Sequence, residues 1–225
     1  MRRNPRRLPA YLLGIALSAG CLVGCRRPRP QAPAQPPAPI ALRVYLYLDP
    51  DFAARFGPLK GKGGAKATSW VQEVNRQMGS QYPVTVTCAG VGSWRPAPGA
   101  LDGKAIFDKY VPRSWPPASN ANCLIAVTGR KGVYWSGISR WPRIFLKAQA
   151  LEPVDEKTVS TLCHEISHWF GTVDIIDAAF PERSVMNYKD KRFGMVDGHV
   201  VWDSGNRDRI AKGVDRWRRT GLPAP

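Results

Sequence analysis

The stretch His164-Glu165-Ile166-Ser167-His168-Trp169-Phe170-Gly171-Thr172-Val173-Asp174 matches the pattern HExxHxxGxxD. An α-helix turns about 100° per residue, so the two histidines lie on one face, one turn apart, and can bind the same metal ion. Glu165 borders that face, where it can serve as the general base of a hydrolysis without being a ligand. The stretch therefore predicts a helix that carries a catalytic zinc site.

The remainder of the pattern predicts a third ligand. Gly171 follows His164 by nearly two helical turns, and glycine tolerates the left-handed conformation that ends a helix. The chain can then turn back and bring Asp174 to the metal, which leaves the fourth tetrahedral position open, as in catalytic zinc sites. His199, the last of the three histidines, is an alternative third ligand if the return loop is longer, and Asp177 is another nearby candidate.

A second signature follows at Ser184-Val185-Met186-Asn187-Tyr188. A lone methionine is more often a core residue. The position of Met186 in this stretch, after the histidine helix, instead indicates the methionine of a Met-turn. The two motifs together resemble the metzincin clan of zinc endopeptidases, whose pattern is HExxHxxGxxH/D followed by a Met-turn. Aspartate is the less common third ligand, and here the chain is similar to the small snapalysin-type bacterial enzymes.

The resemblance implies a hydrolase with one catalytic zinc ion and little about its specificity. Tyr188 is similar to the tyrosine that astacins and serralysins use as a switchable zinc ligand or oxyanion stabiliser. The implied roles are metal ligation by His164, His168 and Asp174, catalysis by Glu165 and Tyr188, and structural support by Gly171 and Met186.

The N-terminus predicts export. Arg2, Arg3, Arg6 and Arg7 precede an apolar segment at residues 8–23 that is short for a membrane span and typical of a secretory signal. Leu22-Val23-Gly24-Cys25 resembles a bacterial lipobox, so residues 1–24 are predicted to be removed as a lipoprotein signal peptide. Cys25 would then carry the lipid. Cys21 is a second option, and an ordinary signal peptide with Cys25 as a spare thiol is the alternative.

The predicted lipid anchor places the protein in the bacterial cell envelope, outside the cytoplasm, and on the outer membrane if the cell has two membranes. Residues 25–39, with the lipidated cysteine and six prolines among them, form a linker that favours an extended polyproline conformation of about 3.1 Å per residue. Residues 40–225 have the length of one domain, the predicted catalytic domain.

Hydrophobic periodicity predicts an α+β fold for this domain. We expect a metzincin-like mixed sheet of five strands, mostly parallel, with an antiparallel edge strand, a zinc helix and a C-terminal helix. The buried strand at 123–128 is apolar without alternation, which favours a central parallel position. The predicted strands are 41–48, 82–88, 123–128, 132–138 and 143–148, and the predicted helices are 65–78, 103–110, 155–170 and 205–220.

The segment 132–138 is the predicted edge strand. An exposed edge can pair with an extended peptide through backbone hydrogen bonds and place a scissile carbonyl at the metal. The expected partner is therefore a protein or peptide substrate bound along this strand.

The chain is strongly basic, with 33 Lys and Arg against 17 Asp and Glu and a formal net charge of +16. The positive electrostatic field of such a chain favours binding to anionic envelope surfaces. No nucleic-acid motif accompanies it, so no nucleic-acid partner is expected. A non-enzymatic, basic envelope-binding lipoprotein that retains the metzincin scaffold is the alternative function. On the C-terminal helix a merely solvated basic face is favoured, formed by Arg207, Arg209, Lys212, Arg216, Arg218 and Arg219.

Cys88, Cys123 and Cys163 are the cysteines of the predicted domain. Cys88 and Cys123 form the obvious disulfide pair in an oxidising compartment. They can also lie too far apart to bridge if they occupy opposite ends of parallel strands. The pairing is therefore left open, and Cys163 is expected to pack away from the metal.

Overall fold

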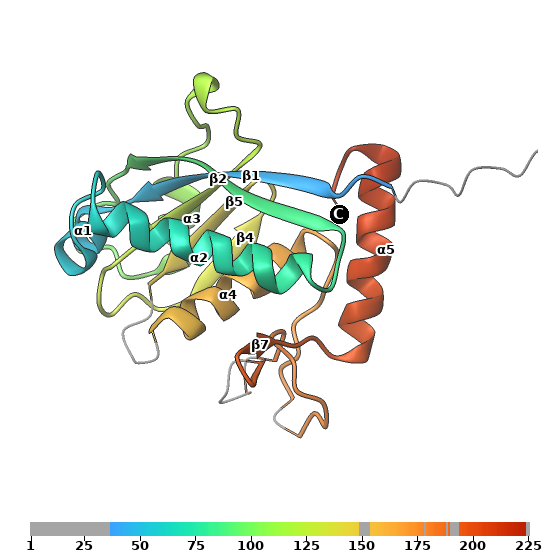
Figure 1. Cartoon of the computed structure of the whole chain (residues 1–225). Coiled ribbons are helices and arrows are strands. Elements are labelled where there is room, and N and C mark those ends of the chain that lie inside the picture. The colour runs from blue at the N-terminus through green and yellow to red at the C-terminus, as the bar shows by residue number, and fades with distance from the viewer. Residues whose placement is uncertain (1–36, 149–153, 178, 188, 190–193, 224–225) are drawn as a thin grey trace, which may run out of the picture. The chain divides into compact units, whose positions relative to one another are not determined.

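The computed structural model describes residues 37–148, 154–177, 179–187, 189 and 194–223 (Figure 1). The predicted signal peptide, Cys25, nearly all of the linker and Tyr188 lie outside the described residues. Within the described residues, no helix is both long enough and apolar enough to cross a bilayer.

A five-stranded sheet forms the centre of the domain, with the strand order β2-β1-β3-β5-β4. Neighbouring strands are parallel except for β4, which pairs antiparallel with β5 at one edge. The predicted mixed, mostly parallel sheet with an antiparallel edge strand is confirmed. The strands are β1 (Ile40–Leu48), β2 (Val84–Ser93), β3 (Cys123–Thr128), β4 (Gly137–Arg140) and β5 (Arg143–Lys147).

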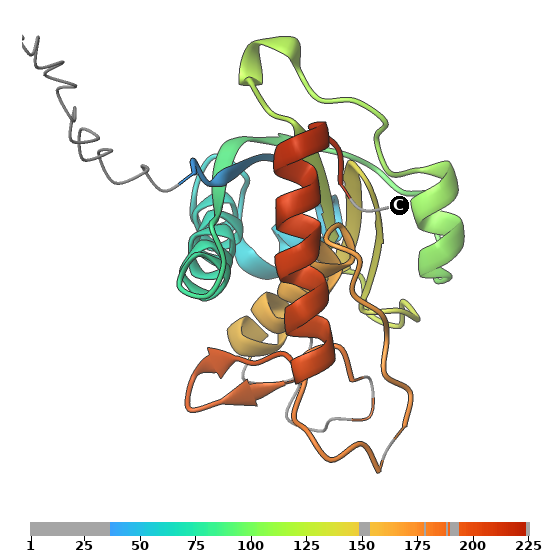
Figure 2. The same cartoon turned by 90° about the vertical axis from the view of Figure 1, so that its right-hand side faces the viewer.

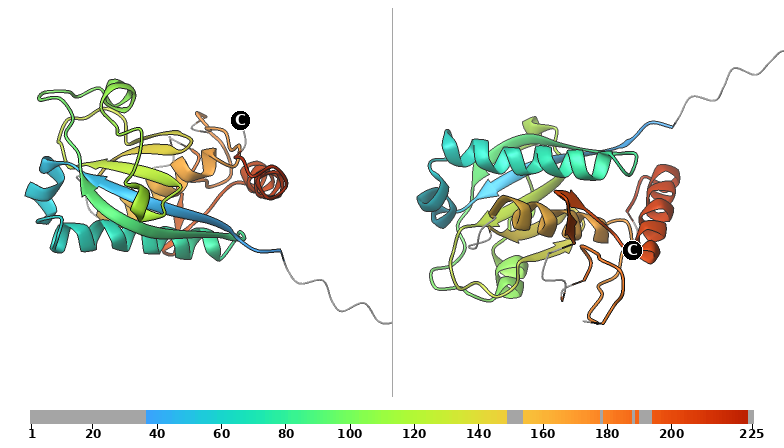
Figure 3. Two further views of the ribbon diagram at one scale, coloured as in Figure 1. Left: turned by 90° about the horizontal axis from the view of Figure 1, so that it is seen from above. Right: turned by 60° about the horizontal axis from the view of Figure 1, so that its bottom comes forward.

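The two faces of the sheet are covered by separate apolar clusters. On β3, Cys123 and Ile125 join the larger cluster, while Leu124 and Ala126 join the smaller one, so this strand is buried on both sides. The helices α2 (Lys62–Gly79) and α4 (Val154–His168) pack side by side on the larger cluster (Figure 3). The helix α3 (Gly103–Lys109) packs on the smaller cluster.

The C-terminal helix α5 (Ser204–Thr220) stands beside the sheet near the beginning of β1 (Figures 1 and 2). It was predicted at 205–220, and its predicted core residues Ile210, Val214 and Trp217 are buried. Gly213 lets α5 approach the end of α4 closely, because a Cβ at this position would lie 2.2 Å from the carbonyl oxygen of Phe170. The last helix is thereby held against the turn that follows the histidines.

The structure corrects the edge strand, which was predicted at 132–138 and spans Gly137–Arg140. The cause is local backbone geometry, because Gly132 and Trp135 have left-handed φ values of 78° and 50°. An extended strand cannot contain such residues. The edge position and the antiparallel direction of the prediction are confirmed.

Several short elements escaped prediction because they contain too few residues for a period to show. The helix α1 (Pro50–Phe56) begins at Asp49, whose carboxylate accepts a hydrogen bond of 2.7 Å from the backbone of Phe52. Asp-Pro is a known start signal for helices. The others are the 3₁₀ turn η1 (Pro117–Ser119) and the hairpin of β6 (Met195–Val196) with β7 (His199–Val200).

The strand register shows whether Cys88 and Cys123 can form the disulfide that the sequence left open. Cys88 and Cys123 both pair with Val44, from opposite sides of β1. Two strand spacings, roughly 9.6 Å, therefore separate them, which exceeds the reach of a disulfide. Cys88, Cys123 and Cys163 are all free, and Cys163 is buried in the core as expected.

Candidate metal centre

The two histidines of α4 present their Nε2 atoms to each other at 3.2 Å. Each ring is held from behind by a backbone carbonyl, because Nδ1 of His164 lies 2.9 Å from the oxygen of Val185 and Nδ1 of His168 lies 3.2 Å from that of Thr172. A carbonyl oxygen can only accept, so Nδ1 carries the proton of each neutral ring and Nε2 is left with a lone pair. This is how ligating histidines are oriented in metal sites.

The chain turns sharply after the second histidine. The last residues tighten from α-helical to i→i+3 hydrogen bonds, including Gly171 N to the oxygen of His168 at 3.0 Å. The helix therefore ends two residues before the predicted end at Phe170. Gly171 has φ of 86°, the left-handed conformation expected of it.

The turn brings Asp174 back to the histidines. Its Oδ1 lies 3.2 Å from Nε2 of His164 and 3.3 Å from Nε2 of His168. Partial burial would raise the pKa of Asp174, but hydrogen bonds from the two histidines in their protonated forms outweigh it and hold the pKa well below its usual range. The carboxylate is thus charged, and with neutral histidines it faces two Nε2 lone pairs.

Contacts on both sides of Asp174 fix its position. Asn206 of α5 holds the preceding residue, accepting from Val173 N at 2.9 Å and donating to the Val173 oxygen at 3.1 Å. The following residue, Ile175, donates its N–H to the oxygen of Met186 at 2.8 Å. The loop carrying the aspartate is therefore anchored both to the C-terminal helix and to the Met-turn.

The turn at residues 184–187, predicted to be a Met-turn, contacts the first histidine. Met186 is fully buried, and its neighbour Val185 supplies the carbonyl that orients His164. Ser184 donates a 2.6 Å hydrogen bond to Asp203, whose carboxylate also caps α5 through Asn206 N at 2.9 Å. Asp203 and Asn206 were missed by the sequence analysis, although Asp-Ser-Gly-Asn before a helical period is an N-cap signal.

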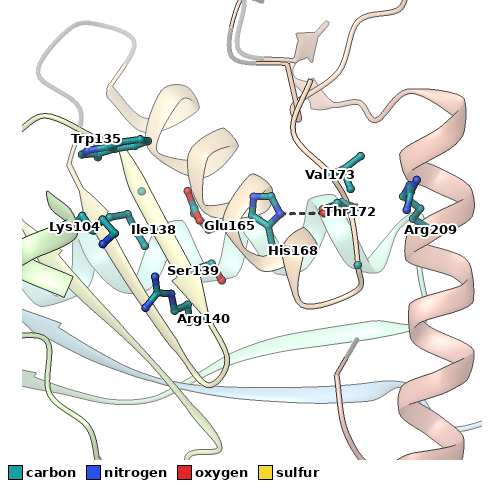
Figure 4. Close-up of a pocket in the computed structure, with 12 residues that line it drawn as sticks. Lys104, Trp135, Ile138, Ser139, Arg140, Glu165, His168, Thr172, Val173 and Arg209 are labelled. Carbon is teal, nitrogen blue, oxygen red and sulfur yellow. Dashed lines mark hydrogen bonds between the residues drawn. The ribbon is translucent and has the colours of Figure 1, made fainter. Parts of the chain in front are cut away.

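Glu165 lies beside the histidines and is only 4% exposed. Burial raises the pKa of Glu165 to about 7, with an opposing effect from the two histidines. The side chain passes close to β4, because a Cβ at Gly137 would lie 2.5 Å from its Oε1. Glycine at this position leaves room for the carboxylate between α4 and the edge strand (Figure 4).

An open cleft of about 610 Å³ lies in front of these residues. Glu165 and His168 form its floor (Figure 4). One wall consists of β4 with Trp135 and Lys104, and the other consists of the turn after α4 together with Arg209 of α5.

The three predicted ligands are the ones that the fold brings together. In the described part of the chain, His164, His168 and Asp174 are the single group of His, Cys, Asp or Glu side chains close enough to share a metal ion. His199 is exposed on β7, and neither it nor Asp177 belongs to the group.

The donor set fits zinc. Tetrahedral ligands at 2.0–2.2 Å from a zinc ion lie roughly 3.3–3.6 Å from one another. The three ligand atoms here are 3.2, 3.2 and 3.3 Å apart. Two imidazole nitrogens and a carboxylate converging in this way can bind a metal cation, and imidazole with carboxylate is a common zinc combination.

Comparisons with known proteins identify similar folds. No protein-family model and no curated protein matches the sequence. A chain from the structure of a chaperone-substrate complex aligns with a TM-score of 0.53 and 10% identity over 80% of this chain. This likeness concerns the fold, and the present chain covers 35% of that chain's length.

Two further similar structures have lower TM-scores. Archaemetzincin from Methanopyrus kandleri aligns with a TM-score of 0.49 and 13% identity, over 75% of this chain and 93% of that one. A zinc-dependent peptidase from Methanocorpusculum labreanum aligns with 0.43 and 11%, over 74% of this chain and 99% of that one.

Proposed function

We propose that this protein is a zinc-dependent endopeptidase. The observation that carries the proposal is the convergence of three ligand atoms at tetrahedral spacing beside a buried glutamate, at the floor of an open cleft. Metal ligands with a fourth position open to solvent and an adjacent carboxylate are the components of metal-assisted hydrolysis.

In this proposal His164, His168 and Asp174 hold one zinc ion, which supplies Lewis-acid chemistry when bound. Glu165 accepts a proton from the attacking water and passes it to the leaving amine. Its location between α4 and Gly137 shields it from bulk water and keeps it in one orientation. Tyr188, two residues after Met186, is proposed as the donor to the developing oxyanion.

The proposed substrate is an extended peptide bound along β4. This strand pairs with β5 on one side and ends the sheet on the other, so its outer N–H and C=O groups are available to a peptide backbone. The strand also forms a wall of the cleft, next to Glu165. A peptide paired with it would run directly past the catalytic groups.

The proposed location is the bacterial cell envelope. The lipobox-like sequence ending at Cys25 and the proline-rich linker support a lipid-anchored enzyme that acts on extracytoplasmic proteins or peptides. The high positive charge would favour an anionic membrane or envelope surface.

Digestion of casein and of a peptide library tests the function. We expect cleavage by the zinc-loaded chain, loss of cleavage with a chelator, and recovery when zinc is added back. Glu165→Gln should keep its zinc and lose about 10²- to 10⁴-fold in kcat, because the acid-base group is removed while the ligands remain.

Two results would contradict the enzyme. One is undiminished cleavage by the zinc-loaded Glu165→Gln chain. The other is an absence of cleavage by the zinc-loaded native chain. In the second case, binding to anionic but not neutral vesicles would favour the alternative of a basic envelope-binding lipoprotein.

A further inference from the structure

Cationic side chains border the cleft on both walls. Lys104 and Arg140 lie on the side of β4, and Arg209 lies on the side of α5 (Figure 4). Among the described residues that line the cleft, Glu165 is the single acid, and it lies at the floor rather than at the rim. The rim of the cleft is therefore positive on each side of the catalytic groups.

On the β4 side, the cationic side chains outnumber the acidic side chain with which they pair. Asp108 is shared between Lys104 at 3.7 Å and Arg140 at 3.2 Å. Arg143 stands directly opposite Arg140 in the β4–β5 pair, and like charges in such a pair are destabilising. Burial lowers the pKa of Arg143, Arg113 and Arg140 lower it further, and Asp108 opposes them. This wall thus carries an excess of positive charge.

The cation on the other wall is exposed, and its position follows from the packing of α5. Arg209 lies between Asn206, which binds Val173, and Gly213, which lies against Phe170. Both contacts hold the helix beside the turn after α4, so Arg209 borders the cleft next to Val173 (Figure 4). No acidic partner is found for it in the part of the chain that the structure describes.

We propose that the cleft selects peptides with acidic side chains next to the scissile bond. Lys104 and Arg140 bind an acidic side chain that faces the β4 wall, and Arg209 binds one that faces the opposite wall. This inference rests on the proposed peptidase function and defines its substrate class. Electrostatic complementarity of this kind contributes mainly to selectivity and to the rate of encounter.

The experiment compares three versions of a peptide that the zinc-loaded full chain cleaves. They carry Glu, Gln or Lys at matched positions before the bond, after it, or on both sides. We expect kcat/KM to be about 2- to 5-fold higher for Glu than for Gln at each productive position, and lowest for Lys, because an exposed ion pair is worth up to about fivefold. The preference should decline as salt screens the charges.

Variants assign each wall to particular peptide positions. Arg209→Glu should reverse the preference from Glu to Lys at the positions that face α5, and the double variant Lys104→Gln, Arg140→Gln should abolish it at the positions that face β4. The matched control is Arg219→Gln, an exposed arginine of α5 that does not line the cleft, and it should behave as the native chain.

The outcomes separate this inference from the proposed function. Equal cleavage of the Glu and Gln peptides, or effects of both walls at the same peptide position, would overturn the acidic selectivity and leave the peptidase intact. If no peptide is cleaved, the peptidase function fails. Fluorescence anisotropy of labelled Glu, Gln and Lys peptides on the Glu165→Gln chain then tests the selectivity by binding alone, and equal affinities would refute it.

Discussion

At the scale of single residues, the metal centre depends on which atom of each side chain faces inward. Two backbone carbonyls, from Val185 and Thr172, bind the Nδ1 atoms of the histidines and so turn both Nε2 atoms toward Asp174. The ligand group is therefore preorganised by hydrogen bonds that involve no other side chain, which is the arrangement that raises metal affinity.

Asp174→Ala should remove one of three protein ligands. We expect zinc affinity to fall by more than the roughly 10- to 100-fold that is typical for loss of a supporting group. Competition with a chromogenic chelator measures the affinity. Asp177→Ala is the matched control, since this exposed aspartate lies three residues further on and outside the ligand group. An unchanged affinity in Asp174→Ala would disprove its role as third ligand.

Asn206→Ala tests a positioning residue. It removes both hydrogen bonds to Val173, so Asp174 loses one of its two anchors and zinc affinity should fall about 10- to 100-fold. Ile210→Val in the same helix is the control, because it costs about 0.5–1.5 kcal/mol of stability without touching the loop. If both variants bind zinc equally well, Asn206 is only a structural residue.

At the scale of elements, the beginning of α5 is joined to the Met-turn through one carboxylate. Asp203 caps the helix and also accepts from Ser184, next to the residue that orients His164. Burial would raise the pKa of Asp203, but the hydrogen bonds from Ser184 and Asn206 outweigh it and lower the pKa below its usual value of 3.8. The charged form thus stabilises the native state.

The stabilisation by Asp203 should depend on pH. A carboxyl with a lowered folded pKa contributes above its unfolded pKa, and the contribution disappears as pH falls through the folded value. Asp203→Ala should therefore cost about 1–2 kcal/mol of unfolding free energy at pH 7, and the difference from the native chain should shrink below pH 3.8. Urea unfolding at pH 7 and pH 3 measures it.

The exposed Asp215 of the same helix provides the comparison. Asp215→Ala should change stability by no more than about 0.5 kcal/mol at either pH, as surface substitutions do. A pH-independent cost of Asp203→Ala would show that the carboxylate acts by packing and not by its charge.

At the scale of the whole molecule, the sheet is held by packing without covalent cross-links among the described cysteines. Burial raises the pKa of Cys123 to about 12 and raises that of Cys163 further. Thiolates are the reactive form, so both thiols should be inert in the folded protein.

Thiol labelling checks this arrangement. Cys88 is half-buried and should react with a maleimide under native conditions, whereas Cys123 and Cys163 should react only in denaturant. Cys88→Ser removes the native signal from the domain and identifies it. Mass spectrometry of peptides counts the labels at each site. A disulfide between Cys88 and Cys123 would contradict the strand register.

The sequence by itself determined the candidate ligands and most of the elements. The spacing of His164 and His168 is a property of any helix, the buried strand at 123–128 was visible as a short apolar run, and the amphipathic helices were visible as periods. These features follow from local geometry, which a short stretch of chain sets without reference to the rest. The mixed sheet and its antiparallel edge were inferred from the order of those elements together with the resemblance to the metzincins.

Tertiary structure decided what depends on distant residues meeting. The edge strand shifted to 137–140 because left-handed residues interrupt the predicted one. Asn206 and Asp203 reach the site from a helix more than thirty residues beyond His168, and no period indicates such contacts. Arg209 belonged to a helix face expected to be only solvated, and it borders the cleft because Gly213 lets that helix approach Phe170. The candidate metal ligands can thus be recognised from a short stretch of sequence. The residues that hold those ligands in place, and the charge around the cleft, are set by packing between distant elements.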